Sequence, residues 1–355
     1  MECGIVGLPG AGKTTLFNAL TGGHASIVPG ASKPNVGVAI VPDPRLALVA
    51  KYVETRKVTP ATITLVDIPG IDAGGGAAKA GPLLSHVRQV DAICQVVRCF
   101  DDGGAGRSID PIRDIETLEI ELILADLQLA ESALDKAVRP ARSGDADAKA
   151  RGAVLERALE ALNDSRPVRT ITDWSQSEQA VISSYGLVTA KRVLYVANVG
   201  EDDLAGESEP AKLVHSHGAS SGGEAVAVSG KLEAELAELD EADRLEMLEA
   251  LGLTEPAIGP VARGVCRLLG LAVFYTTSPK EIRAWTVSAQ ATAPQAAGVV
   301  HSDMQRGFIR AECYSVDDLV QHESEKAIRA AGRLRTEGKN SRIRDGDVMR
   351  FLFSV

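Results

Sequence analysis

Residues near the start of the chain have the types and spacing of a phosphate-binding loop. Gly7, Gly12, Lys13 and Thr14 form the pattern G-x-x-x-x-G-K-[ST], between an apolar run and a helical pattern. Glycines let successive backbone N–H groups face one anion, and a helix N-terminus adds partial positive charge. Lys13 is expected to reach the β- and γ-phosphates, and the Thr14 hydroxyl to ligate Mg²⁺. The sequence therefore predicts a nucleotide site whose phosphates contact Gly10, Ala11, Gly12, Lys13, Thr14 and Thr15.

A second motif, D-x-x-G, follows a predicted buried strand at residues 61–67. Asp67 at the carboxyl end of that strand is expected to hold Mg²⁺ directly or through water, and the Gly70 N–H to contact the γ-phosphate. In Ras-like switches a glutamine after this motif orients the attacking water, whereas Ile71 stands here and offers no hydrogen bond. The catalytic residue is therefore unknown, and slow intrinsic hydrolysis is expected.

A third motif, Asn198-x-x-Glu201, ends a predicted strand at the place where guanine-reading proteins carry N-K-x-D. Asn198, Val199 and Glu201 are expected to line the base, and residues 226–231 to close its pocket. Glu201 is one methylene longer than the aspartate that accepts two hydrogen bonds from guanine. Adenine loses nothing when that aspartate is absent, so the spacing favours ATP over GTP. Phe100 is expected in the core, with a wall of the pocket as the alternative.

Composition limits the possible environments of the chain. Its 355 residues are 45% hydrophobic and carry a formal net charge of −10, which argues against a general nucleic-acid coat and against a DNA partner. The five cysteines are scattered and form no C-x-x-C pair, which indicates reduced thiols rather than a zinc site or disulfides. No signal peptide and no membrane-spanning run is evident, so we expect a cytoplasmic protein without a membrane partner.

The hydrophobic pattern predicts an α/β fold that positions these motifs. Buried strands precede each motif, and two runs with helical spacing, separated by a break at residues 140–144, predict an inserted helical hairpin. Period-two alternation and turns after residue 271 predict a small separate α+β domain. The expected division is a nucleotide domain at 1–112 and 191–271, the hairpin at 113–190 and the terminal domain at 272–355.

The sequence resembles the Obg-like ATPase (YchF) family of translation-factor-type P-loop NTPases along almost its whole length. The resemblance rests on G-L-P-G-A-G-K-T-T-L-F-N-A-L-T, K-P-N-V-G-V-A-I-V-P-D-P-R-L, V-D-I-P-G-I, V-D-A-I-C-Q-V-V-R-C-F and L-Y-V-A-N-V-G-E-D. The terminal R-A-W-T-V and D-G-D-V-M-R-F segments are similar to the TGS domain of that family, a β-grasp-like module. The resemblance implies a preference for ATP, a translation-linked role and the ribosome as partner.

Three positions depart from the family pattern. The family's phosphate loop has asparagine where this chain has Gly10, which removes a side chain that could help hold a monovalent cation. The family's Mg²⁺-ligating threonine of the first switch aligns with Ala31, and the neighbouring Ser32 is a weak substitute ligand. The second switch loop, residues 73–82, is shorter than usual. These changes are expected to affect the completion of the Mg²⁺ ligand shell and the hydrolysis rate more than nucleotide binding.

Other functions remain open at this point. A GTPase would differ in base specificity, and a small-molecule kinase would need an acceptor pocket and usually a basic lid. A nucleotide-gated ribosome-binding module without catalysis would show no turnover with water as acceptor. The terminal domain also offers a candidate RNA-binding face, formed by Arg283, Arg310, Arg342, Arg344 and Arg350.

Overall fold

The computed structural model describes residues 1–23, 33–70, 84–101, 108–253 and 255–354. The chain forms two compact units, one made of residues 1–37 and 64–265 and the other of residues 38–63 and 266–355. The predicted roles of Ala31, Ser32 and Ile71, and of the second switch loop, fall outside the described residues.

The first unit is built on a sheet that places the ends of its strands at one edge. The first strand, β1, lies between β4 and β5 and runs parallel to both, and β5, β6 and β7 continue the parallel pairing. In such sheets, ligands bind outside the carboxyl ends of the strands. In spatial order the strands are β2 (Asn35–Val41), β4 (Ala61–Asp67), β1 (Glu2–Val6), β5 (Ala92–Cys99), β6 (Val193–Val199) and β7 (Glu224–Val228).

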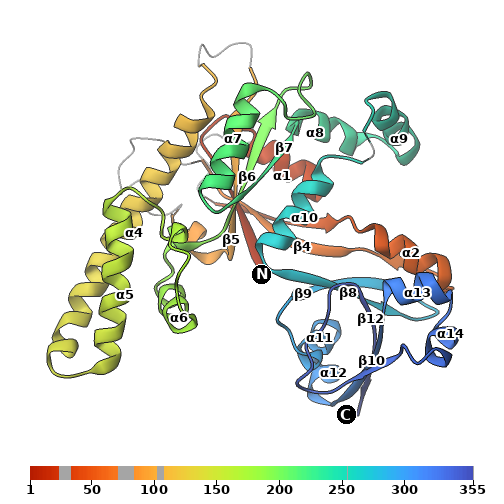
Figure 1. Cartoon of the computed structure of the whole chain (residues 1–355). Helices are drawn as coiled ribbons and strands as arrows, with labels where there is room; N and C mark the ends of the chain where they lie inside the picture. The colour runs from red at the N-terminus through yellow and green to blue at the C-terminus, as the bar shows by residue number, and fades with distance from the viewer. Residues whose placement is uncertain (24–32, 71–83, 102–107, 254, 355) are drawn as a thin grey trace. The chain divides into compact units, whose positions relative to one another are not determined.

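Helices α4 and α7 pack against this sheet (Figure 1). Buried side chains of β1, β4, β5 and β6 share one apolar core with residues of α4 and α7. Within the described ranges, no helix combines the length and apolar character that a membrane crossing needs. The helices are α1 (Lys13–Thr21), α4 (Pro111–Arg142), α5 (Ala146–Asn163), α6 (Gln176–Tyr185), α7 (Glu209–Ser220), α8 (Gly230–Glu238), α9 (Glu241–Ala250) and α10 (Ile258–Leu268), the last running into the second unit.

The helical hairpin is present, but its first helix is longer than the sequence pattern indicated. The helices α4 and α5 lie side by side (Figure 1) and bury Ala130, Ala133, Leu155 and Ala158 in a shared core. The predicted break at residues 140–144 begins too early, because Pro140 lies inside the last turn of α4 and the helix ends at Arg142. Proline has no N–H to bond the carbonyl four residues before it, so the last turn of α4 lacks one hydrogen bond. The Pro140 carbonyl accepts the backbone N–H of Ser143 just beyond the end of the helix.

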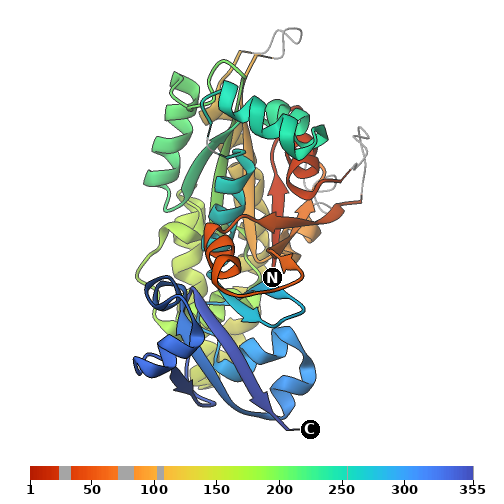
Figure 2. The same ribbon diagram turned by 90° about the vertical axis from the view of Figure 1, so that its right-hand side faces the viewer.

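The second unit contains a mixed six-stranded sheet. Its spatial order is β11-β10-β12-β8-β9-β3, with antiparallel β10–β11, β10–β12 and β8–β9 pairs and parallel β12–β8 and β3–β9 pairs. Figure 2 shows α11 and α12 against one face of this sheet, where the alanines of α11 and Met304 of α12 pack in its apolar core. The strands are β3 (Val58–Thr59), β8 (Leu271–Thr277), β9 (Ile282–Ser288), β10 (Phe308–Ser315), β11 (Arg335–Glu337) and β12 (Asp347–Phe353). The helices are α2 (Pro44–Tyr52), α11 (Ala293–Val300), α12 (Ser302–Arg306), α13 (Val316–His322) and α14 (Glu325–Ala330).

The fold class expected from the sequence is confirmed: a P-loop α/β unit with a helical insertion is joined to a terminal unit with its own mixed sheet. The two units divide the chain differently from the sequence-based boundaries. Residues 38–63 belong to the second unit, because β3 pairs with β9 and the start of α2 bonds to β8 and to the loop before β12.

Candidate nucleotide site

The phosphate loop connects β1 to α1 and has a geometry that requires glycine. Gly12, the N-cap of α1, has a left-handed φ of 89°, and a Cβ there would lie 2.2 Å from Asn198 Nδ2. Lys13 begins the helix, is 8% exposed and donates from Nζ to the Leu8 carbonyl at 2.9 Å. The loop thus holds the lysine beside the helix N-terminus, where an anion is favoured.

Asp67 lies next to the phosphate loop, and one of its two carboxylate oxygens accepts hydrogen bonds. Its Oδ2 accepts the Thr14 hydroxyl at 2.9 Å and the Asn35 amide at 3.2 Å. Its Oδ1 is buried and has no hydrogen-bond partner among the residues that the structure describes. A buried, unpartnered carboxylate oxygen beside a threonine hydroxyl fits the oxygen ligands that Mg²⁺ prefers.

Gly70 also lies against the phosphate loop. A Cβ built on it would be 3.1 Å from Lys13 Nζ and 3.3 Å from the Pro9 backbone nitrogen. The two motifs predicted to contact the terminal phosphate therefore meet in the fold.

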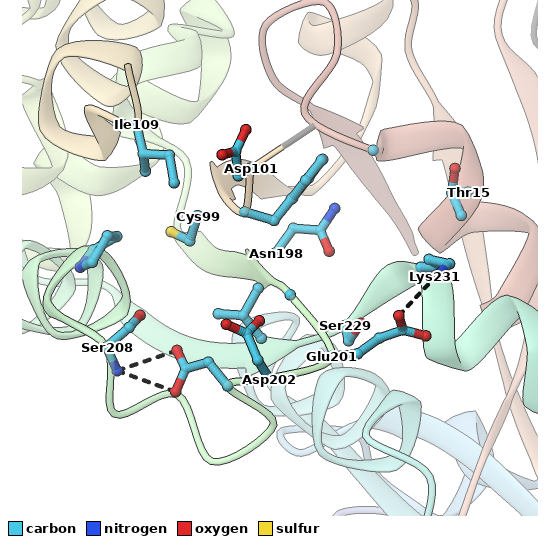
Figure 3. A pocket seen from close by; sticks show the side chains of 16 residues that line it. Thr15, Cys99, Asp101, Ile109, Asn198, Glu201, Asp202, Ser208, Ser229 and Lys231 are labelled. Carbon is cyan, nitrogen blue, oxygen red and sulfur yellow. Dashed lines mark hydrogen bonds and ion pairs between the residues drawn. The ribbon is translucent and has the colours of Figure 1, made fainter. Parts of the chain in front are cut away.

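A cavity of about 750 Å³ opens beside the phosphate loop and takes its walls from three further segments (Figure 3). The volume lies within the range of small-molecule sites. Phe100 lines the cavity just after the end of β5. The structure therefore supports its alternative role as a wall of the pocket. The lining residues are Gly12, Thr15, Cys99, Phe100, Asp101, Ile109, Asn198, Val199, Gly200, Glu201, Asp202, Asp203, Ser208, Pro210, Ser229 and Lys231.

Asn198 joins the phosphate loop to the segment that closes the base cavity. Its Nδ2 donates to the Ala11 carbonyl and its Oδ1 accepts the Gly230 N–H, both at 2.9 Å. The side chain is 4% exposed, and its amide nitrogen carries a second hydrogen that can serve a base. Val199 is 2% exposed and packs in the sheet core, so its backbone is the part available to a ligand.

Glu201 is held by Lys231, for which the sequence predicts a place in the segment that closes the pocket but no contact with Glu201. Lys231 donates from Nζ to Glu201 Oε2 at 2.8 Å, and this hydrogen bond raises the pKa of Lys231 (Figure 3). Lys231 belongs to the S-G-K segment expected to close the pocket, which was the available signal for it. The signal for Asn35 is its place in K-P-N-V-G, one of the motifs on which the family resemblance rests.

The five arginines of the terminal unit do not form one face. Alternate strand residues face opposite sides of a sheet. Arg283 is on the same face as Trp285, over whose ring its guanidinium lies at 4.1 Å, and this face packs in the apolar core. Arg310 and Arg350 lie on the opposite face, because their neighbours Ala311 and Met349 point into that core.

Comparisons with known proteins agree with this arrangement. Residues 2–128 match the family described as 50S ribosome-binding GTPase. Residues 271–354 match the YchF GTPase C-terminal family, described as a protein of unknown function.

Relatives match along the full chain. The ribosome-binding ATPase YchF of Haemophilus ducreyi is 42% identical over 100% of this chain and 99% of its own length. The protein of the same name from Bacillus subtilis is 39% identical, with both chains fully covered. The solved structure of the Schizosaccharomyces pombe YchF GTPase is 31% identical, has a TM-score of 0.87 and covers 99% of this chain and 97% of that one. The chain therefore belongs to the YchF family of P-loop NTPases.

Proposed function

We propose that this protein is a Mg²⁺-dependent, slowly hydrolysing ATPase that acts with the ribosome. The observation that carries the proposal is the continuity of the site: one cavity joins the phosphate loop to Glu201, the position that distinguishes this motif from a guanine reader. The relatives named ribosome-binding ATPase support both the nucleotide and the partner. A ribosomal partner implies a cytoplasmic location.

The phosphate loop and its lysine bind the phosphates. Lys13 and the backbone N–H groups at the start of α1 bind the β- and γ-phosphates, and Gly70 contributes its N–H beside Lys13. The Thr14 hydroxyl donates a hydrogen bond to Asp67, so the hydroxyl oxygen keeps its lone pairs for Mg²⁺. Asp67 Oδ1 is the second candidate ligand. When bound, Mg²⁺ neutralises charge on the phosphates.

Slow hydrolysis follows from the residue after D-x-x-G. Ile71 stands where Ras-like switches have the glutamine that orients water, and an isoleucine has no side-chain group that can form a hydrogen bond. Turnover of the isolated protein should fall far below the ~1–100 s⁻¹ of kinases.

GTP is the second candidate substrate, because the matched family and the solved relative are both described as GTPases. Titrating labelled ATP and GTP into nucleotide-free protein with Mg²⁺ separates the two. We expect ATP to bind at least ~10-fold more tightly, since the lost bidentate contact to guanine corresponds to about 1–3 kcal/mol, by analogy with base readout. Equal affinities, or tighter GTP, would refute the ATPase assignment.

A further inference from the structure

We propose that Asn35 is a positioning residue for Asp67 and sets how tightly the site holds Mg²⁺. This inference rests on the proposed function, because it concerns the metal of that site. The family resemblance implies a first-switch contribution at Ala31 or Ser32. In the described part of this segment, Asn35 at the first residue of β2 contacts Asp67.

The two oxygens of Asp67 have opposite surroundings. Oδ2 receives two donors from different elements, Thr14 Oγ1 on α1 at 2.9 Å and Asn35 Nδ2 on β2 at 3.2 Å. Oδ1 receives none from the described residues, although Asp67 is only 4% exposed. Two donors on one oxygen fix the rotation of the carboxylate about its Cβ–Cγ bond. The unpartnered oxygen is thereby held in the position where a cation relieves its burial.

The chemical type of Asn35 suits this role. Its amide donates a hydrogen bond without carrying charge. A lysine at this position would compete with the cation for Asp67, and an aspartate would repel the carboxylate instead of orienting it. Asn35 therefore fixes the geometry of Asp67 and leaves its negative charge to the metal.

The position of Asn35 is fixed by the close approach of β2 to α1. A Cβ at Gly37 would lie 2.7 Å from both Phe17 Cζ and Thr21 Cγ2, two side chains of α1. Only glycine lets the strand pack this closely, and the same helix carries Thr14. The two donors to Asp67 Oδ2 are thus held by one strand–helix contact.

The test measures metal affinity rather than hydrolysis. Asn35→Ala removes the donor, and Asn35→Leu removes it while keeping a side chain branched at Cγ. Mg²⁺ is titrated into each variant with a fluorescent ATP analogue, and analogue affinity is also measured in EDTA. Because groups that hydrogen-bond to metal ligands typically contribute 10–100-fold to metal affinity, we expect half-saturating Mg²⁺ to rise at least tenfold. Analogue affinity in EDTA should stay within about twofold, since Asn35 is assigned no phosphate contact.

Asn163→Ala is the matched control, because it removes the same side chain from an exposed position at the end of α5. It should leave half-saturating Mg²⁺ unchanged. Wild-type metal dependence in both Asn35 variants would overturn the proposal. Equal losses of analogue affinity with and without Mg²⁺ would also overturn it, because they would show a structural role. If wild-type protein binds the analogue equally well in EDTA and Mg²⁺, the proposed function itself fails, which is a separate result.

Discussion

At the mouth of the base cavity, Lys231 holds the carboxylate that occupies the base-reading position. The Lys231 and Glu201 side chains are 69% and 45% exposed, so solvent screens their ion pair and its contribution is small. We therefore expect most discrimination between adenine and guanine to come from the extra methylene of Glu201. The ion pair adds a smaller effect, because a carboxylate bonded to Lys231 is less available to the N–H groups of guanine.

Replacing Lys231 with methionine should therefore raise GTP affinity by no more than about fivefold, because a solvent-exposed ion pair is weak. ATP affinity should change less than about twofold, because adenine does not need the carboxylate. Both affinities are measured by titrating labelled nucleotide into nucleotide-free protein. Lys326→Met, an exposed lysine on α14, is the control. A gain in ATP affinity as large as that for GTP would contradict this account.

Residue roles were predictable where one motif contains the whole contact. Gly12, Lys13 and Thr14 are consecutive, and their shared geometry follows from the pattern alone. Asn35 and Lys231 were not predictable, because their partners Asp67 and Glu201 are 32 and 30 residues away. A half-buried asparagine and an exposed lysine look ordinary until the fold brings those carboxylates to them.

Among the elements, α2 shows how the second unit holds residues 38–63. Asp43 caps the helix by accepting the Arg45 N–H at 3.0 Å, and also accepts the Tyr275 hydroxyl at 2.5 Å. Arg45 donates to Asp345 at 2.6 Å, before β12. The helix was predictable from its capping aspartate and proline, but its attachment was not, since Tyr275 is 232 residues from Asp43.

Tyr275→Phe should destabilise the second unit by about 1–3 kcal/mol, because a buried carboxylate loses a donor. Urea unfolding at neutral pH measures this. Tyr52→Phe, at the end of α2 in the same unit, is the control for loss of a tyrosine hydroxyl that does not bond Asp43. An effect of Tyr275→Phe no larger than that of the control would show that the bond to Asp43 does not contribute.

The same variant should change the response to acid. Burial raises the pKa of Asp43, but hydrogen bonds from Arg45 and Tyr275 outweigh it and leave the pKa below its usual value. A lowered folded pKa gives stability that is present above the unfolded pKa of about 3.9 and is lost as the pH falls through the folded value. The stability difference between wild type and Tyr275→Phe should therefore be full at neutral pH and narrow below about pH 4.

The chain passes between its two units three times, at 37–38, 63–64 and 265–266. The order of domains and the fold class followed from motif order and periodicity, since each unit has strong patterns of its own. The sequence did not predict that residues 38–63 belong to the second unit. Their strand β3 is two residues long and pairs with a strand more than 200 residues away. A two-residue strand has no detectable alternation.

This topology determines how the contact with the ribosome must be tested. Deleting residues 272–355 would remove the sheet partner of β3 and the tyrosine that bonds Asp43. The remaining residues 38–63 would lose their packing, so lost association would not identify an RNA-binding face. Point substitutions in the full chain avoid this difficulty.

Arg310 and Arg350 are the suitable pair, because both are exposed on the sheet face away from the apolar core. If this face contacts ribosomal phosphates, Arg310→Glu with Arg350→Glu should weaken association with ribosomes. The slope of log affinity against log salt should fall by about one for each lost phosphate contact, because fewer counterions are released. Arg306→Glu reverses the same charge on α12, which packs on the other face, and should leave both quantities unchanged. Co-sedimentation across a salt series measures the effect, and an unchanged slope in the double variant would place the ribosome contact elsewhere in the chain.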